Sequence, residues 1–193
     1  MLQVSPETQQ LSKEFCVYQV AEPCGVVLFG ASGDLAHRKL IPALFDLRHQ
    51  HLLPPRFFLL GAGTSQLDDA AFQREVAATL KRAGKESLDA ETASAFTKSA
   101  HFLSGNFTDP AMYRALAQRL SELERRYQTG GNRVFYLAIP PTLYGQVVGQ
   151  LGAAELTHRS GTQAPWGRVI IEKPFGRDPE SAQQLTQTLH QVL

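Results

Sequence analysis

The sequence predicts an α/β fold: a doubly wound, mostly parallel sheet with helices on both faces, of the Rossmann type. Five short apolar stretches alternate with helical patterns along the chain, as expected when crossover helices follow parallel strands. A glycine-containing turn joins the first apolar stretch to the first helical pattern. Hydrophobic residues make up 43% and charged residues 19% of the 193 residues, a composition that allows one domain with a buried core.

The first 23 residues show no sustained periodicity, so we expect a flexible leader over 1–23 and a dinucleotide-binding domain over 24–193. Strands are expected where β-branched, aromatic and other apolar residues cluster. The expected strands are 25–30, 57–61, 100–104, 133–139 and 168–172. Glycine and proline predict a loop over 152–167, and a last amphipathic helix is expected over 179–193.

Helical periodicity fills most of the gaps between these strands. After the first strand, apolar residues recur at helical spacing at Leu35, Leu40, Ala43, Leu44 and Leu47. A second helix is expected over 68–84, where an acidic start suits the positive end of the helix dipole. The clearest helix has Thr108 as its predicted N-cap, an apolar stripe over 112–127 and an end at the glycines 130–131.

The turn after the first strand has the residue types that bind a diphosphate. Gly30 lets the chain turn sharply, and Gly33 removes a side chain that would keep phosphate from the amides at the next helix start. Small Ala36 allows that helix to pack closely on the strand. A plain glycine turn is the alternative, but the flanking strand and helix favour phosphate. The predicted cofactor-binding residues here are Gly30, Ala31, Ser32, Gly33, Asp34 and Leu35.

Charge and composition exclude several classes of partner. The net charge is +1 and the basic residues are scattered, so no nucleic-acid partner is expected. No apolar run is long enough to cross a membrane, and the polar start over 1–10 is no signal peptide, so we expect a cytoplasmic protein. Cys16 and Cys24 are expected to be reduced. The six histidines lack metal-ligand spacing and are expected at the surface or partly buried, with no metal.

A second signature lies at the end of the fifth strand, where Glu172, Lys173 and the Pro-Phe-Gly of 174–176 follow one another. Together with the segments 30–44 and 135–141, this signature closely resembles the glucose-6-phosphate dehydrogenase family. The resemblance covers about residues 24 to 193. Members of that family are much longer, so the chain looks like their N-terminal dinucleotide-binding half, without the C-terminal substrate and catalytic domain.

The resemblance implies an NAD(P)-dependent dehydrogenase that acts on a CH-OH group. Such an enzyme oxidises glucose 6-phosphate to 6-phosphogluconolactone and passes hydride to NADP, in the first step of the oxidative pentose phosphate pathway of glucose metabolism. The complete enzyme would bind glucose 6-phosphate and form a homo-oligomer. The chain alone is expected to bind cofactor but to be catalytically incomplete. The alternative is a stand-alone dinucleotide-binding or interaction module that never catalyses.

The resemblance also assigns a catalytic role to Lys173, whose family counterpart contacts both cofactor and sugar phosphate. Its task would be to position the substrate against the nicotinamide; a solvated strand end is the alternative reading of this lysine. The family's general-base histidine belongs to an Arg-Ile-Asp-His-Tyr-Leu-Gly-Lys motif, and this sequence does not contain that motif.

Cofactor preference depends on Thr64, which follows the second strand where the adenosine ribose is expected. The resemblance implies NADP, but NADP-dependent members carry arginine at this position, so NAD stays possible. A basic side chain from elsewhere, such as Arg74, could compensate. An ordinary loop before the next helix explains the hydroxyl of Thr64 equally well.

Two further groups of predicted cofactor-binding residues follow the third and fourth strands. Asn106 and Phe107 are expected at the adenine end, although a capped loop explains them equally well. Ala138 and the prolines 140–141 are expected to form a stiff wall beside the nicotinamide, with Tyr144 nearby. A purely structural turn is the alternative for this second group.

Overall fold

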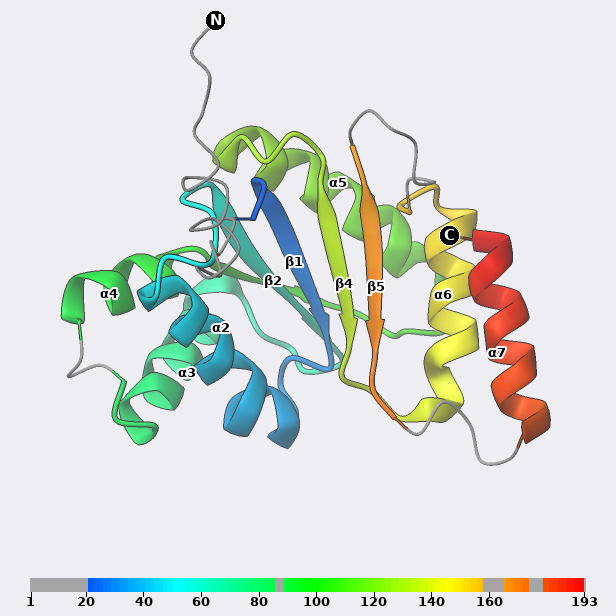
Figure 1. Ribbon diagram of the computed structural model, residues 1–193, viewed down its shortest axis with the longest axis horizontal. Coiled ribbons are helices and arrows are strands. Elements are labelled where there is room, and N and C mark those ends of the chain that lie inside the picture. The colour runs from blue at the N-terminus through cyan, green and yellow to red at the C-terminus, as the bar shows by residue number, and fades with distance from the viewer. Residues whose placement is uncertain (1–20, 86–88, 158–164, 174–178, 193) are drawn as a thin grey trace, which may run out of the picture.

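The computed structural model describes residues 21–85, 89–157, 165–173 and 179–192, and these residues form a single sheet covered by helices (Figure 1). The sheet has five strands in the order β3-β2-β1-β4-β5, and every neighbouring pair is parallel. The strands are β1 (Cys24–Phe29), β2 (Phe57–Gly63), β3 (Ala100–Ser104), β4 (Arg133–Leu137) and β5 (Gly167–Ile171). The predicted doubly wound, parallel fold is therefore confirmed.

Helices pack on both faces of the sheet. One face carries η1 (Ala36–Leu40), α2 (Ile41–His49), α3 (Asp69–Arg82) and α4 (Ala90–Lys98). The other carries α5 (Pro110–Tyr127), the short turn η2 (Pro141–Leu143), α6 (Tyr144–Ala153) and α7 (Pro179–Val192). None of the helices in the described part of the chain is long and apolar enough to cross a membrane.

The central strand β1 contributes side chains to the hydrophobic cores on both faces of the sheet. All its residues are buried, and successive side chains alternate between the two faces. Val27 and Phe29 belong to the core under α5 and α6, whereas Val26 and Leu28 belong to the core under α2 and α3. A strand buried on both faces must be apolar throughout, which is the signal that predicted it.

Strand order reverses between β1 and β4, and this reversal fixes where a ligand can bind. The chain leaves β1 towards β2 on one side, and it later returns to place β4 on the other side. The two crossovers therefore separate at the carboxyl ends of β1 and β4, which lie at the bottom of Figure 1. Open α/β sheets bind ligands in the crevice at such a point.

The helix starts correct one prediction. Thr108 was the expected N-cap of α5, but Asp109 takes this position and accepts a hydrogen bond from the Ala111 amide at 2.8 Å. Thr108 instead donates its amide to the Asn106 side chain at 3.0 Å. An Asx turn at Asn106 thus uses Thr108, and Pro110 follows as the first helical residue, as proline prefers.

Several element boundaries also differ from the prediction. Strand β2 runs two residues further than expected and ends at Gly63, and β4 ends at Leu137, two residues early. The predicted loop over 152–167 is wrong at its first residues, because α6 continues to Ala153. A Cβ at Gly152 would lie 2.8 Å from a Val192 side-chain carbon, so this glycine lets α6 and α7 approach closely.

Predictions near the N-terminus of the chain lie partly outside the described residues. The expected leader 1–23 is described only from residue 21, and there Asn132 donates a side-chain hydrogen bond to the Pro23 carbonyl at 3.0 Å. Cys16 is outside the described residues, whereas Cys24 is a buried free thiol whose pKa burial raises to about 11. Such a thiol is a poor nucleophile at neutral pH.

A polar network closes the free edge of β3. Asp69 accepts hydrogen bonds from the Phe102 amide at 2.9 Å and from Nδ1 of His101 at 2.7 Å, and it pairs with Arg119 of α5. Gln73 donates to the Ala100 carbonyl at 3.0 Å. His101 is only 1% exposed, which corrects the expectation of surface or partly buried histidines. The network satisfies backbone groups that an edge strand would otherwise leave open.

Acidification is expected to destabilise the fold through His101. Burial lowers the pKa of His101, despite the opposing hydrogen bond and charge of Asp69, so the folded state favours the neutral ring. As the pH falls below the unfolded value of about 6.5, the unfolded chain takes up the proton first. Stability is then lost by at most about 1.4 kcal/mol per pH unit for this group.

Urea unfolding at a series of pH values checks this prediction. His101→Gln is expected to flatten the decline in unfolding free energy below about pH 6.5. The matched control is His190→Gln, at an exposed position of α7. An unchanged slope in the His101 variant would show that this ring does not bind the proton responsible.

Candidate functional site

The candidate site begins at the turn between β1 and η1. Steric constraints require a glycine at position 30 of this turn. Gly30 has φ of +80°, and a Cβ built there would lie 2.2 Å from the Ala138 carbonyl oxygen. The Gly30 amide donates to the Ala62 carbonyl at 2.8 Å, so the turn is tied to β2. Glycine at position 30 therefore lets the end of β1 pass directly between its two neighbouring strands.

Amide donors in this turn divide into two sets. The Gly30, Ala31 and Gly33 amides donate to carbonyls of the protein, Gly33 to that of Gly30 at 2.9 Å. In the part of the chain that the structure describes, the Ser32, Asp34 and Leu35 amides donate to no other group. These are the donors that a helix start offers to an anion.

Gly33 leaves the approach to these amides open. It is exposed, and a Cβ at this position would contact only the Gly30 carbonyl oxygen, at 3.1 Å. The remaining space is where an anion bonded to the Asp34 and Leu35 amides would lie. The predicted residues of the turn thus form a cradle that fits a diphosphate, and Gly33 contributes the absence of a side chain rather than its own donor.

Hydroxyl groups join the loops that follow β1, β2 and β3. Ser65 donates a hydrogen bond to Ser32 at 2.9 Å, and Ser104 donates to the Ser65 carbonyl at 2.8 Å. Thr64 lies beside this chain of bonds and is exposed. The structure thus brings Thr64 and Ser32 to the same part of the carboxyl edge, where the ribose of a bound dinucleotide would be expected.

Basic side chains gather on the η1 side of Ser32. A cavity of 620 Å³ there is lined by Ser32, His37, Arg38, Arg82 and their neighbours. Nδ1 of His37 lies 2.8 Å from the Thr79 hydroxyl, to which Arg82 donates at 3.1 Å. Burial lowers the pKa of His37, so the ring favours the neutral form. Arg74, the compensating residue suggested by the sequence, does not line this cavity.

At the ends of β4 and β5, two tyrosines contact Glu172, the residue before Lys173. Tyr136 donates to Oε1 of Glu172 at 2.5 Å, and the Tyr144 hydroxyl lies 3.5 Å from the Glu172 carbonyl oxygen. Burial, together with the bond to Glu172 and its charge, raises the pKa of Tyr136 to about 12. Lys173 itself is exposed, and the Pro-Phe-Gly of 174–176 that follows it lies outside the described residues.

Asn106 and Phe107, which follow β3, already make contacts that stabilise the fold. Oδ1 of Asn106 accepts two hydrogen bonds from Thr108, each at 3.0 Å, although the residue is exposed. The Phe107 ring packs in the core with its centroid 5.7 Å from that of Phe29, and the Phe107 carbonyl accepts from Tyr113 at 2.8 Å. Both residues border the carboxyl edge, and their contact with an adenine stays a prediction.

Two residues at this edge had no role in the sequence prediction. The carboxylate of Glu172 and the hydroxyl of Tyr136 meet across neighbouring strands, 36 positions apart. The available signal was the phenol of Tyr136 between Phe135 and Leu137 of β4, since a half-buried tyrosine hydroxyl usually needs a partner. Arg82 was likewise missed, because only the packing of α3 against η1 brings it near Ser32.

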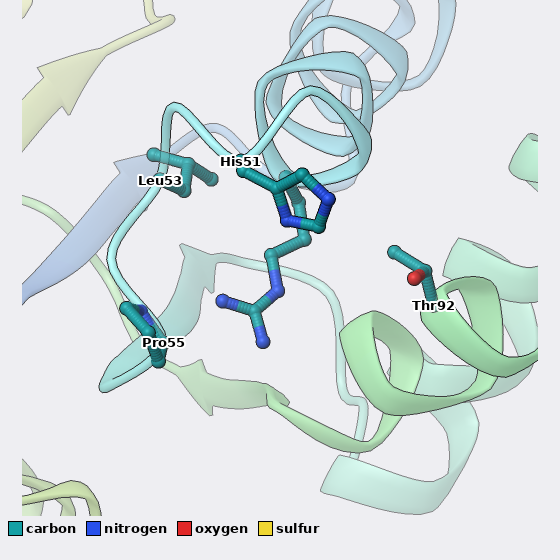
Figure 2. Close-up of a pocket in the computed structure, with 5 residues that line it drawn as sticks. His51, Leu53, Pro55 and Thr92 are labelled. Carbon is teal, nitrogen blue, oxygen red and sulfur yellow. The ribbon is translucent and has the colours of Figure 1, made fainter. Parts of the chain in front are cut away.

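A second cavity lies near the amino ends of the strands, opposite the candidate site, and is not part of that site. Figure 2 shows His51, Leu53 and Pro55, on the connection between α2 and β2, facing Thr92 of α4. The cavity measures 240 Å³ and is also lined by Arg48, which donates to the Pro54 carbonyl at 2.8 Å. It lies at the amino ends of the strands, where open α/β sheets do not bind their ligands.

The strand order and the amide-bearing turn at the switch point define a dinucleotide-binding domain of the Rossmann class. Among the described residues, no group of histidine, cysteine and acidic side chains could hold a metal ion. The family model for "Glucose-6-phosphate dehydrogenase, NAD binding domain" matches residues 27–193. The chain therefore belongs to the glucose-6-phosphate dehydrogenase family.

Individual relatives agree with this assignment. Glucose-6-phosphate 1-dehydrogenase 2 of Mycobacterium tuberculosis is 36% identical over 178 residues, which are 90% of this chain and 34% of the relative. Glucose-6-phosphate 1-dehydrogenase of Treponema pallidum is 41% identical over 165 residues, 85% of this chain and 32% of the relative. The chain thus spans about a third of the length of these relatives.

Solved structures give the same result. A glucose-6-phosphate dehydrogenase in complex with its substrate glucose-6-phosphate superimposes with a TM-score of 0.74 and 30% identity, covering 91% of this chain and 35% of that one. Glucose-6-phosphate 1-dehydrogenase from Mycobacterium avium gives a TM-score of 0.72 and 29% identity, covering 89% and 34%. The similarity therefore extends over nearly all of the chain.

Proposed function

We propose that this chain binds a nicotinamide dinucleotide at the carboxyl edge of its sheet, as the cofactor-binding part of a glucose-6-phosphate dehydrogenase. The observation that carries the proposal is the turn at Gly30–Leu35, which presents the Ser32, Asp34 and Leu35 amides at the topological switch point. Family membership supports the same ligand. In this reading the diphosphate binds these amides, and the adenosine ribose lies by Thr64.

The nicotinamide end would lie towards β4 and β5. Ala138 and Tyr144 would form its wall, with Asn106 and Phe107 at the adenine end of the edge. The bound cofactor would accept the hydride removed from C1 of the sugar. Lys173 would hold the sugar phosphate and orient that carbon, since positioning is a large part of such catalysis. Tyr136 supports this task by holding Glu172, the residue before the lysine.

The reaction needs groups that these residues do not include. A general base must accept the proton of the C1 hydroxyl, and positioned bases contribute about 10² to 10⁴ in rate. The family motif that carries such a histidine does not occur among the 193 residues. We therefore propose that the complete enzyme acts on glucose 6-phosphate, whereas this chain contributes cofactor binding. Cytoplasmic location and homo-oligomer formation stay predictions from the sequence.

Calorimetric titration of the purified chain with NADP and with NAD tests this proposal. We expect one cofactor per chain and a preference for NADP below about a thousandfold, or about 4 kcal/mol, because Thr64 carries no charge. We also expect negligible NADPH formation when glucose 6-phosphate is added. Failure to bind either dinucleotide would refute cofactor binding, and appreciable NADPH formation would refute catalytic incompleteness.

Thr64→Arg is expected to strengthen NADP binding by about tenfold to a hundredfold, since a charge-assisted hydrogen bond contributes about 1.5–3 kcal/mol. NAD binding should change little, because NAD lacks the phosphate that the arginine would pair with. Arg74→Ala is the matched control and should leave both affinities unchanged, because Arg74 does not line the cavity beside Ser32. Equal changes in both affinities would place the ribose phosphate away from residue 64.

A further inference from the structure

The cavity beside Ser32 collects positive charge next to the turn after β1. It measures 620 Å³ and is lined by Ser32, by residues of η1 and by residues at the end of α3. Among the lining residues that the structure describes, three are cationic at neutral pH and one, Asp34, is acidic. The cations are Arg38, Lys39 and Arg82. The cavity therefore suits an anionic group carried by a ligand at the turn.

The three cations differ in how far acidic groups already neutralise them. Arg38 pairs with Asp34 at 3.2 Å. In the described ranges, neither Lys39 nor Arg82 has an acidic side chain within ion-pair distance. The Lys39 side chain also makes no hydrogen bond there, whereas that of Arg82 makes one. Arg82 is therefore the cation that the fold holds in place and whose charge remains for a ligand.

A row of polar contacts holds the Arg82 guanidinium. Its Nη2 donates to the Thr79 hydroxyl at 3.1 Å, and that hydroxyl lies 2.8 Å from Nδ1 of His37. Burial lowers the pKa of His37, despite the opposing charge of Glu75, so the neutral ring can accept the Thr79 proton at Nδ1. Thr79 is only 2% exposed, so this anchor is fixed where α3 packs against η1. A guanidinium has five N–H donors, and those not used here are available to a phosphate.

The hydroxyl of Ser32 connects this cavity with the expected position of the ribose. Ser65 donates to Oγ of Ser32 at 2.9 Å, so the proton of the Ser32 hydroxyl is available to a ligand. The end of β2 lies close by, because a Cβ at Gly63 would be 3.3 Å from Oγ of Ser32. In the proposed function the adenosine ribose lies by Thr64, the residue between Gly63 and Ser65. A group on the 2′ oxygen of that ribose would therefore lie near Ser32 and the cavity beside it.

We propose that Arg82 of α3 binds the ribose 2′-phosphate of NADP together with the Ser32 hydroxyl, and so supplies the positive charge that Thr64 lacks. The inference rests on the proposed function and deepens it, because it names the residue that distinguishes NADP from NAD in this chain. Arginine suits the task, since two of its parallel N–H donors match two phosphate oxygens. NAD carries a hydroxyl at this position and would leave Arg82 in water.

Titration of the 193-residue chain with NADP and with NAD tests the role of Arg82. Arg82→Gln is expected to lower NADP affinity about tenfold or more, because a charge-assisted hydrogen bond to phosphate is lost. NAD affinity should change little, since NAD lacks that phosphate. The matched control is Arg125→Gln, at an exposed position in the last turn of α5 on the other face of the sheet, and it should leave both affinities unchanged.

Two further variants extend this test. Arg82→Lys keeps the charge but loses the planar pair of donors, so its NADP affinity should lie between those of the wild type and Arg82→Gln. This variant also serves if thermal unfolding shows that Arg82→Gln does not fold. Thr64→Arg should raise NADP affinity more in the Arg82→Gln background than in the wild type, because both arginines would pair with the same phosphate.

Adenosine 2′,5′-bisphosphate and adenosine 5′-monophosphate serve as probes that differ only in the ribose phosphate. The bisphosphate should bind more tightly to the wild-type chain, and Arg82→Gln should remove most of this difference. Unchanged NADP affinity in Arg82→Gln would overturn the inference. Equal losses for NADP and NAD would also overturn it, since the charge would then serve the diphosphate. Both outcomes leave cofactor binding at the turn standing, whereas a wild-type chain that binds neither dinucleotide would refute the proposed function as well.

Discussion

Gly33→Val is expected to lower the affinity for both NADP and NAD by at least a hundredfold, or about 2.7 kcal/mol. The valine side chain would fill the space in front of the Asp34 and Leu35 amides, where the diphosphate is proposed to bind. The fold should tolerate the change at a cost of about 1 kcal/mol or less, since a Cβ at this exposed position meets only one carbonyl oxygen, at 3.1 Å. Calorimetric titration measures the loss, and thermal unfolding checks the fold.

Gly149→Val is the matched control for this variant. Gly149 lies in α6, and a Cβ there would meet no other atom within 4 Å. The same substitution is thus made away from the turn, and dinucleotide affinity should not change. Equal affinities for the wild type and Gly33→Val would remove the turn from the site.

Glu124→Ala is expected to lower the unfolding free energy by about 3–5 kcal/mol. Glu124 of α5 accepts hydrogen bonds from Arg133 at 2.6 and 3.1 Å, and Arg133 also donates to the Leu156 carbonyl at 3.1 Å. The two side chains are only 14% and 11% exposed, so removing the carboxylate would leave a buried, unpaired guanidinium. The pair links α5, the start of β4 and the segment just after α6, which is why its loss should affect the whole domain.

Urea unfolding compares this variant with Glu122→Ala on the same helix. Glu122 pairs with Arg119 at 2.7 Å, but its side chain is 55% exposed. Solvent screens such a pair, and its loss should cost about 0–1 kcal/mol. Similar losses for the two variants would show that burial does not decide the strength of these ion pairs.

Much of the fold could be predicted because its signals are local. Strand β1 is a short apolar run bounded by a glycine, and α5 carries an apolar stripe at helical spacing. Local signals do not identify the N-cap when two adjacent residues are both suitable for that position. Thr108 and Asp109 are both good N-caps, and the choice between them depends on Asn106, which bonds Thr108 in a turn.

The candidate site divides in the same way. The turn at Gly30–Leu35 was predictable, because the strand, the glycines and the helix are consecutive in sequence. The pairs Ser32–Ser65 and Tyr136–Glu172 join positions 33 and 36 residues apart, and no spacing rule connects them. His101 looked like an ordinary polar residue, since its partner Asp69 lies in α3, 32 positions before it in the sequence. Such contacts follow from the packing of elements, so only the folded structure shows them.

The most direct test is a crystal structure of the chain with NADP. We expect diphosphate oxygens within hydrogen-bond distance of the Ser32, Asp34 and Leu35 amides, with the adenosine ribose beside Thr64. A cofactor bound at any other place, with the turn at Gly30–Leu35 free of ligand, would contradict this expectation.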